Sequence, residues 1–177
     1  TNEFEITGVK VINRSSVKGT VSMRTFIRGG VNNYSIEYQG VEELLLSMIA
    51  EGGPASMSKV EYQERLEALG ANISSSSGYD YGNISLSSIK QYFYEAAEIY
   101  LEAIVNPALR QEDFELIKER MLTNVRQAKT NPDAHLMNRA MSSTWKGTDY
   151  EKNPSGTEES IKNLSFDLVK RYHKTAF

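Results

Sequence analysis

Few side chains in this sequence could attack a substrate or hold a metal ion. Its 177 residues contain no cysteine and only two histidines, so disulfides, thiolate zinc sites and cysteine nucleophiles are excluded. Serines gather at positions 74–77, but no histidine lies near them in sequence and no G-x-S-x-G motif occurs. We therefore expect neither a cysteine hydrolase nor a serine hydrolase.

Positive and negative charges are balanced along the chain. The 20 basic residues are matched by 23 acidic residues, and no block of like charge occurs. Nothing therefore indicates a nucleic-acid footprint or a patch that would bind an anionic membrane. Four aromatic residues could suggest base stacking, but without a basic groove they indicate helix packing. They are Tyr92, Phe93, Tyr94 and Tyr100. We expect no nucleic-acid partner and no membrane contact.

The length of the chain fits one folded unit. A chain of this size buries about 70% of its unfolded surface, which is enough for one core without disulfides or metals. We therefore expect a single domain over residues 1–177. The segment Thr1–Phe4 has neither the basic nor the apolar region of a signal peptide. We expect either a cytosolic chain or one cut after such a segment.

The elements that must position any site begin with strands. Residues 4–6, 9–12 and 21–27 alternate apolar with polar side chains, which is typical of half-buried strands. Because they follow one another closely, we expect them to form a meander. Glycine and asparagine residues at 29–33 then indicate a loop.

Two helices and a hairpin are expected next. Apolar residues at i, i+3, i+4 and i+7 spacing over 41–48 predict a helix, which Gly52-Gly53-Pro54 ends. A second helix begins with the capping box Ser58–Glu61 and continues to about residue 69. Residues 71–77 and 81–87 flank a turn and predict a hairpin of serine-rich strands.

Long helices fill the remainder of the chain. We expect helices over about 91–106 and 111–129, a further helix capped at Asn131, and a final amphipathic segment over 166–177. The order is therefore strands, two helices, hairpin and helices. This order indicates an α+β fold, with helices packed on one face of a mainly antiparallel sheet.

Short segments along nearly the whole chain match one family in their order and spacing. They are Phe26–Gly30, Gly40–Gly53, Leu66–Ala71, Asn106-Pro107 with the helix through Glu119-Arg120, Gln127–Pro132, Pro154–Thr157 and Tyr172-His173. Together they resemble the pitrilysin/insulinase superfamily of zinc peptidases, which includes the mitochondrial processing peptidase. Each segment alone is a weak signal, whereas the order of all of them is specific. The resemblance implies the processing-peptidase-like metallohydrolase fold.

The resemblance places the zinc motif of this family on residues that cannot form it. In active relatives, H-x-x-E-H on one helix supplies two zinc-binding histidines and the glutamate that activates water. These positions correspond to Glu43, Leu46 and Ser47, and the third zinc ligand corresponds to Asn124. Only Glu43 could contact a metal, and Leu46 cannot take a proton from water. We therefore expect no catalytic residue and no zinc ion in this domain.

Such domains keep a role in this family without zinc. Its members resemble clamshells of repeated α+β domains, in which degenerate domains accompany a catalytic one in the same chain or in a partner subunit. Arg28-Gly29-Gly30, Glu51-Gly52-Gly53 and Gln127-Ala128-Lys129 are most similar to bacterial non-catalytic versions. The resemblance thus implies part of a peptide-holding chamber, with zinc in a partner domain. Because relatives usually continue past the position of His173, we expect a fragment of a longer multi-domain chain.

The serine-rich strand is the expected place for a peptide. In active relatives the equivalent strand pairs its edge with extended substrate peptide. That edge corresponds to Ile73, Ser74, Ser75, Ser76 and Ser77. Short polar side chains let a peptide backbone approach, but they also protect a merely soluble edge strand from aggregation. Both interpretations stay open on the sequence.

Other functions also stay open. One alternative is a structural or assembly protein that resembles the core subunits of respiratory complexes. An independently active peptidase is nearly excluded by the four replaced positions. We expect His135 to be a surface residue and His173 to be structural. Bacterial relatives often act in the cell envelope, so the periplasm is an expected location beside the cytoplasmic alternative.

Overall fold

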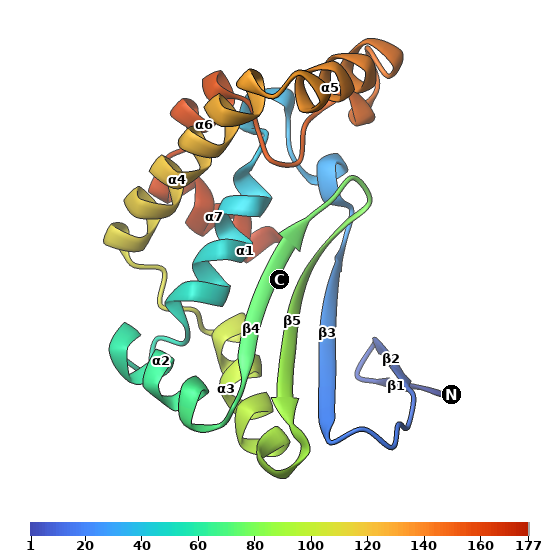
Figure 1. Ribbon diagram of the computed structural model, residues 1–177, viewed down its shortest axis with the longest axis vertical. Coiled ribbons are helices and arrows are strands. Elements are labelled where there is room, and N and C mark those ends of the chain that lie inside the picture. Colours follow the sequence, from blue (N-terminus) through green and yellow to red (C-terminus); the bar gives the residue numbers. More distant parts are fainter. Residues whose placement is uncertain (177) are drawn as a thin grey trace.

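A three-stranded antiparallel sheet is the centre of the fold. The computed structural model describes residues 1–176. Strands β3 (Thr20–Arg28), β5 (Tyr81–Ile89) and β4 (Asn72–Ser77) lie in the order β3-β5-β4, so β3 and β4 are the edges. The predicted hairpin is β4 and β5, paired from Asn72 with Ser87 to Ser77 with Gly82. Figure 1 shows the sheet in front of its helices.

Two helices cover one face of this sheet. They are α1 (Val41–Gly52) and α3 (Phe93–Val105). The inward side chains of β5 alternate with outward ones, so Ile84 and Leu86 are buried under these helices. Tyr100 of α3 is also buried; its hydroxyl donates to the Ile84 carbonyl at 2.8 Å and accepts from Thr25 Oγ1 at 2.7 Å. The α+β arrangement with helices on one face is therefore confirmed.

A second group of helices packs beside α1. It consists of α2 (Lys59–Ala68), α4 (Gln111–Thr130) and α7 (Phe166–Ala176), together with α6 (Glu158–Asn163), which packs against α4. Ser58 caps α2 as predicted, because its Oγ accepts from the Glu61 N–H at 3.1 Å. Helix α4 buries Phe114, Ile117 and Met121. Short 3-10 turns lie before α1 at Gly30–Asn33 and Ile36–Tyr38, before α3 at Lys90–Tyr92 and before α6 at Asp149–Glu151.

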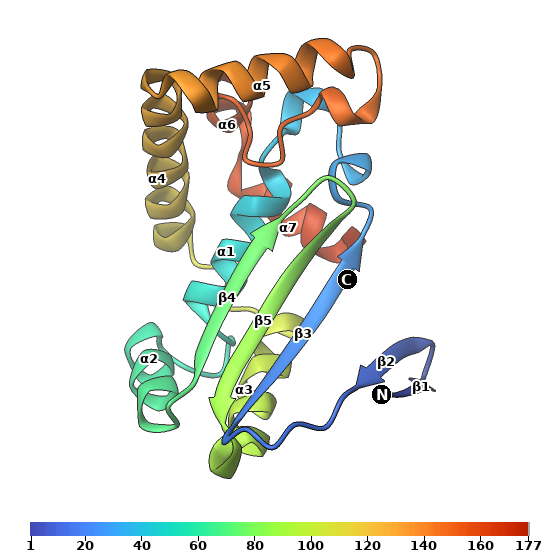
Figure 2. The same cartoon turned by 45° about the vertical axis from the view of Figure 1, so that its right-hand side comes forward.

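Helix α5 (Pro132–Thr144) lies across one end of the molecule (Figure 2). The side chain of Asn131 caps it by accepting from the N–H groups of Asp133 at 3.0 Å and Ala134 at 3.1 Å. None of the residues of α5, all of them within the described range, is fully buried. His135 is exposed there, as expected. None of the helices among residues 1–176 is both long and apolar enough to cross a membrane.

The first two strands form a separate sheet. β1 (Asn2–Ile6) and β2 (Val9–Asn13) pair with each other through a turn in which Thr7 and Gly8 both have positive φ. Strand β3 instead pairs with β5 along its whole length, from Thr20 with Ile89 to Arg28 with Tyr81. The expected meander is therefore wrong. The apolar side chains of β3 that alternate toward the helices pack there beside β5, whereas Phe4 and Ile6 of β1 and Val9 and Ile12 of β2 are exposed.

Candidate functional site

Helix α1 and the end of β4 form the candidate site. We call it the α1–β4 site, and it consists of Glu42, Glu43, Ser77, Tyr34 and Tyr172. Helix α1 is buried on nearly all sides, because Leu44, Leu45 and Leu46 follow one another around it. Its first turn nevertheless carries two carboxylates. The site is therefore a pair of acidic groups at the end of an edge strand.

Glu42 is a buried carboxylate with both oxygens engaged. Only 1% of the residue is exposed. Its Oε1 accepts from Ser77 Oγ at 2.9 Å, and its Oε2 accepts from Tyr172 Oη at 2.7 Å. Room for this carboxylate comes from Gly82, where a Cβ atom would lie 2.7 Å from Glu42 Oε1. Glu42 therefore ties α1 to the end of β4 and to α7.

The two tyrosines of the site stay protonated beside this charge. Tyr34 and Tyr172 are both buried, with ring centroids 6.2 Å apart in an edge-to-face arrangement. Burial, together with the negative charge of Glu42, raises the pKa of both hydroxyls above their usual value. Tyr172 consequently acts as a hydrogen-bond donor to Glu42 and not as a base.

Glu43 points to the backbone of the edge strand. Its Oε2 accepts from the Ser77 N–H at 3.0 Å. Burial raises the pKa of Glu43 above its usual value, while the Ser77 N–H and the charge of Arg120 act in the opposite direction. Unlike Glu42, the residue is only partly buried. Glu43 is therefore the acidic group of the site that a ligand could reach.

The contact with Glu43 reveals which backbone groups of β4 point outward. Since the Ser77 N–H bonds to Glu43, it points away from β5. In an antiparallel pair the bonded and non-bonded residues alternate, so the N–H and C=O groups of Ile73 and Ser75 point to the same open side. Their side chains face α1, while those of Ser74 and Ser76 are exposed on the other face. The predicted peptide strand is thus an edge strand whose last outward N–H is occupied.

The positions that correspond to the zinc motif lie in different surroundings. Leu46 is 1% exposed and faces the sheet, since a Cβ atom at Gly82 would lie 2.7 Å from its Cδ1. Ser47 is buried in α1. Asn124 is exposed on α4. Within residues 1–176, no three His, Asp or Glu side chains are grouped so that they could hold a metal ion.

An ion pair lies between α1 and α4 instead. Arg120, one turn before Asn124, forms a two-pronged contact with Glu51 of α1, with Nη1 to Oε2 at 2.9 Å. Hydrogen bonding to Glu51 raises the pKa of Arg120, and the charge of Glu43 acts in the same direction. The side of α1 that faces α4 is therefore occupied by a charged pair.

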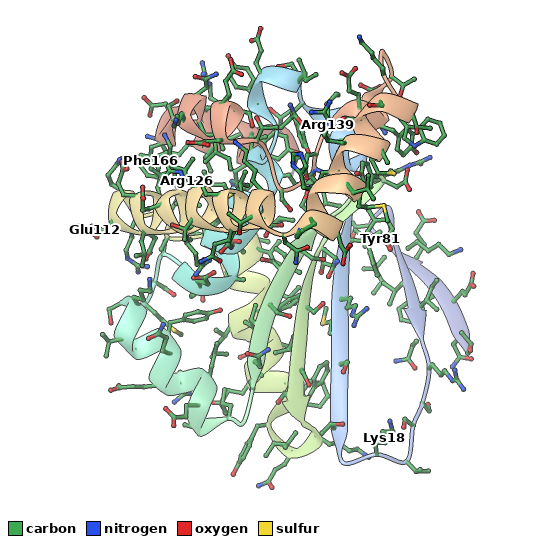
Figure 3. The ribbon with its side chains drawn as sticks, turned by 45° about the horizontal axis from the view of Figure 1, so that its top comes forward. Lys18, Tyr81, Glu112, Arg126, Arg139 and Phe166 are labelled. Carbon is green, nitrogen blue, oxygen red and sulfur yellow. The ribbon has the colours of Figure 1, made fainter. Side chains whose placement is uncertain are left out.

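Asn124 lines an open groove that the sequence did not predict. The groove has a volume of about 860 Å³ and lies between α4, α5 and the segment that leads into α6. Lys129, His135 and Glu158 also line it, and Figure 3 shows Arg126 on α4 and Arg139 on α5. Glu158 is held by Arg126 at 3.2 Å and by Lys129 and Lys162 at 3.1 Å. The groove is therefore lined by both positively and negatively charged side chains.

The sequence did not identify Glu42 or Tyr34 as residues of the site. Glu42 could have been found, because a helix that is apolar all round must bury the polar residues it contains. Tyr172 was noted only as part of a motif, and its contact with Glu42 crosses 130 positions of the chain. Such long-range contacts leave no signal in local spacing.

Comparison with known families gives the identity of this fold. The family model for insulinase, peptidase family M16, matches residues 10–158. The chain belongs to this family. The M16 domain is also similar to the mitochondrial-processing peptidase subunit alpha of Solanum tuberosum, with 21% identity over 166 residues. The match covers 93% of this chain and 32% of the potato protein, so the M16 domain spans about a third of that relative.

Solved structures share the fold of this M16 domain. A protease from Helicobacter pylori superimposes with a TM-score of 0.88 at 15% identity, covering 99% of this chain and 43% of the other. An inactive M16 peptidase domain from Pseudomonas fluorescens gives 0.78 at 22% identity, covering 88% and 38%. A chain of complex III2 from Candida albicans, bound to Inz-5, gives 0.80 at 16% identity, covering 97% and 39%. These similarities establish the fold.

Proposed function

We propose that this M16 domain is a non-catalytic part of a zinc metallopeptidase. It would form part of the chamber that holds peptide, while a catalytic M16 domain in the same chain or in a partner subunit supplies the zinc site. The observation that carries this proposal is which residues occupy the four zinc-motif positions and what they contact. Leu46 faces the sheet where an active member needs a glutamate, and Glu43 contacts a backbone N–H where one needs a histidine.

The chemistry of these positions supports a domain without zinc. Catalytic zinc sites in proteins need three strong protein ligands and one open position. Of the four motif positions, Ser47 is buried and neutral and Asn124 is an exposed amide. The fold itself is shared with an inactive M16 domain. We therefore propose that the domain kept the fold and lost the metal.

The edge of β4 supports the peptide-holding role. An extended peptide can add to an exposed strand edge through main-chain hydrogen bonds. The outward groups of Ile73 and Ser75 offer such bonds, and the small side chains of the strand leave room beside them. We propose Ile73–Ser77 as the peptide-binding edge.

Hydrogen exchange tests the peptide-holding role. We expect an extended peptide to slow exchange of the Ile73 and Ser75 amides while leaving the amides of the outer edge strand β3 unchanged. Equal protection of both edges, or of neither, would contradict the proposal. Titration with Zn²⁺ adds a second test, in which the natural chain takes up no zinc. The quadruple variant Glu43→His, Leu46→Glu, Ser47→His and Asn124→Glu is expected to gain zinc binding.

A structural or assembly role is the second candidate. The observation that favours it is the similarity to a chain of complex III2, which covers 97% of this M16 domain. Affinity capture of the full parent protein from its native cells distinguishes the two candidates. A parent or stoichiometric partner that carries H-x-x-E-H supports the peptidase role. Stable partners without that motif, together with no peptide binding at β4, support the structural role.

A further inference from the structure

The outward side of β4 has a defined end. A peptide that adds to this edge pairs with every second residue, and those residues are Ile73, Ser75 and Ser77. The carboxylate of Glu43 already occupies the Ser77 N–H at 3.0 Å. Main-chain pairing can therefore continue past Ile73 and Ser75 but meets a carboxylate at Ser77.

One oxygen of the Glu43 carboxylate can accept a hydrogen bond from a ligand. Among the hydrogen bonds of residues 1–176, Glu43 uses only its Oε2. The neighbouring Glu42 has both oxygens engaged inside the protein. Glu43 Oε1 is thus the acceptor that the α1–β4 site leaves for a ligand. A carboxylate oxygen forms its strongest hydrogen bonds with cationic donors such as ammonium and guanidinium groups.

The charges around Glu43 favour a cation. Helix α1 contributes the carboxylates of Glu42, Glu43 and Glu51, and α4 contributes the guanidinium of Arg120. Arg120 is held in its two-pronged contact with Glu51. Tyr34, which also faces the site, is neutral because burial raises its pKa. The end of β4 therefore carries an excess of negative charge in a partly desolvated place, where an incoming cation is stabilised more strongly than in water.

We propose that Glu43 positions peptides on β4 and selects those with a cationic group where the strand pairing ends. The group is a free α-ammonium or the side chain of Lys or Arg, because both present the same donor chemistry to a carboxylate. This inference rests on the proposed peptide-holding role of the β4 edge. It turns the position that corresponds to a zinc ligand into a specificity residue.

The decisive experiment compares matched peptides on matched variants. The probe is a short extended peptide of alternating valine and serine, acetylated and amidated, with one lysine at either end in turn. Its twin carries norleucine in place of lysine, and a further version has a free N-terminus without lysine. Binding is measured by calorimetry on the natural protein, on Glu43→Gln and on Glu43→Ala. Glu112→Gln, exposed at the far end of α4 (Figure 3), is the control.

We expect the cationic peptides to bind the natural protein about tenfold more tightly than their norleucine twin. The preference disappears in Glu43→Gln and Glu43→Ala and persists in Glu112→Gln. Comparing the affinity of the peptide that has a free N-terminus with that of the two lysine peptides shows which cationic group the site prefers. Equal affinity of cationic and neutral peptides for the natural protein would overturn the inference while leaving peptide binding at the edge intact.

Exchange of the Ser77 amide gives an independent readout. Without peptide, this amide exchanges slowly in the natural protein and in Glu43→Gln, whose amide oxygen can still accept. It exchanges faster in Glu43→Ala. A Ser77 amide that exchanges equally fast in the natural protein and in both variants would overturn the positioning role of Glu43. If no peptide protects any β4 amide, the peptide-holding proposal fails, and this inference fails with it.

Discussion

The two edges of the central sheet are protected in different ways. Strand β3 is nine residues long, and its outward face carries Arg24 and Arg28 beside an exposed Phe26. Strand β4 has six residues, carries four consecutive serines and ends at the carboxylate of Glu43. Charged side chains and short strands both discourage unwanted pairing. The difference is that β4 ends beside the α1–β4 site, whereas the outward side chains of β3 include two arginines. A peptide on β4, as proposed, would meet a carboxylate at the end of the strand.

The largest expected effect is on the attachment of β4 to α1. Glu42→Ala removes the acceptor of Ser77 Oγ and of Tyr172 Oη and leaves both hydroxyls buried. We expect the free energy of unfolding to fall by about 3 kcal/mol. Urea denaturation measures this. The control is Glu37→Ala on the exposed turn before α1, which is expected to stay within about 0.5 kcal/mol. A loss below that of the control would show that Glu42 does not secure the strand.

The next effect distinguishes the edges directly. Ser75→Pro and Arg24→Pro each remove one outward N–H, and neither removes a hydrogen bond inside the sheet. We expect Ser75→Pro to weaken peptide binding about tenfold and Arg24→Pro to leave it unchanged. Fluorescence anisotropy with a labelled extended peptide gives both values, and circular dichroism checks that both variants are folded. The reverse order of effects would place the peptide on β3.

A smaller effect concerns the charge of Glu43. Its pKa is raised in the folded state, so the folded protein binds a proton there more readily than the unfolded chain. The stabilisation is complete below the unfolded pKa and is lost as pH rises through the folded one. Glu43→Gln removes this loss. We expect the variant to be more stable than the natural protein at pH 7, by no more than about 1 kcal/mol, and to lose this advantage at pH 4. Denaturation at both pH values measures it.

The smallest effect lies away from both edges. Glu158 is partly exposed, and its contacts with Lys129, Lys162 and Arg126 hold its pKa at about 2. Because this pKa is depressed, the stabilisation is present above the unfolded pKa and is lost as pH falls through the range from about 4.5 to about 2. Glu158→Gln should make the free energy of unfolding depend less on pH between about 4.5 and about 2, without changing peptide affinity. A change in peptide affinity would show that α6 is coupled to the β4 edge.

Local patterns in the sequence predicted most elements of the fold. The spacing of Leu44, Leu45 and Met48 predicted α1, the Ser58 cap predicted the start of α2, and serine-rich alternation predicted the β4–β5 hairpin. These features depend on neighbours a few positions apart. The family assignment from ordered motifs is also confirmed.

Contacts between distant segments could not be predicted in this way. The pairing of β3 with β5 instead of β2 depends on which strands share the helices, and alternation alone does not encode that choice. The burial of Glu42 depends on Tyr172 and on the missing side chain at Gly82. The absence of zinc and the binding of peptide at Ile73–Ser77 stay predictions.

Helix α5 gives the groove beside α4 an unequal pair of walls. Helix α4 is anchored by buried side chains, whereas α5 is held by its Asn131 cap and by half-buried contacts. Segments with few buried apolar contacts open locally at a small fraction of the global unfolding cost. A protease added to the native protein should therefore cut within 132–144 before it cuts within α4. We therefore expect the α5 wall of the groove to unfold and refold locally while the rest of the molecule stays folded.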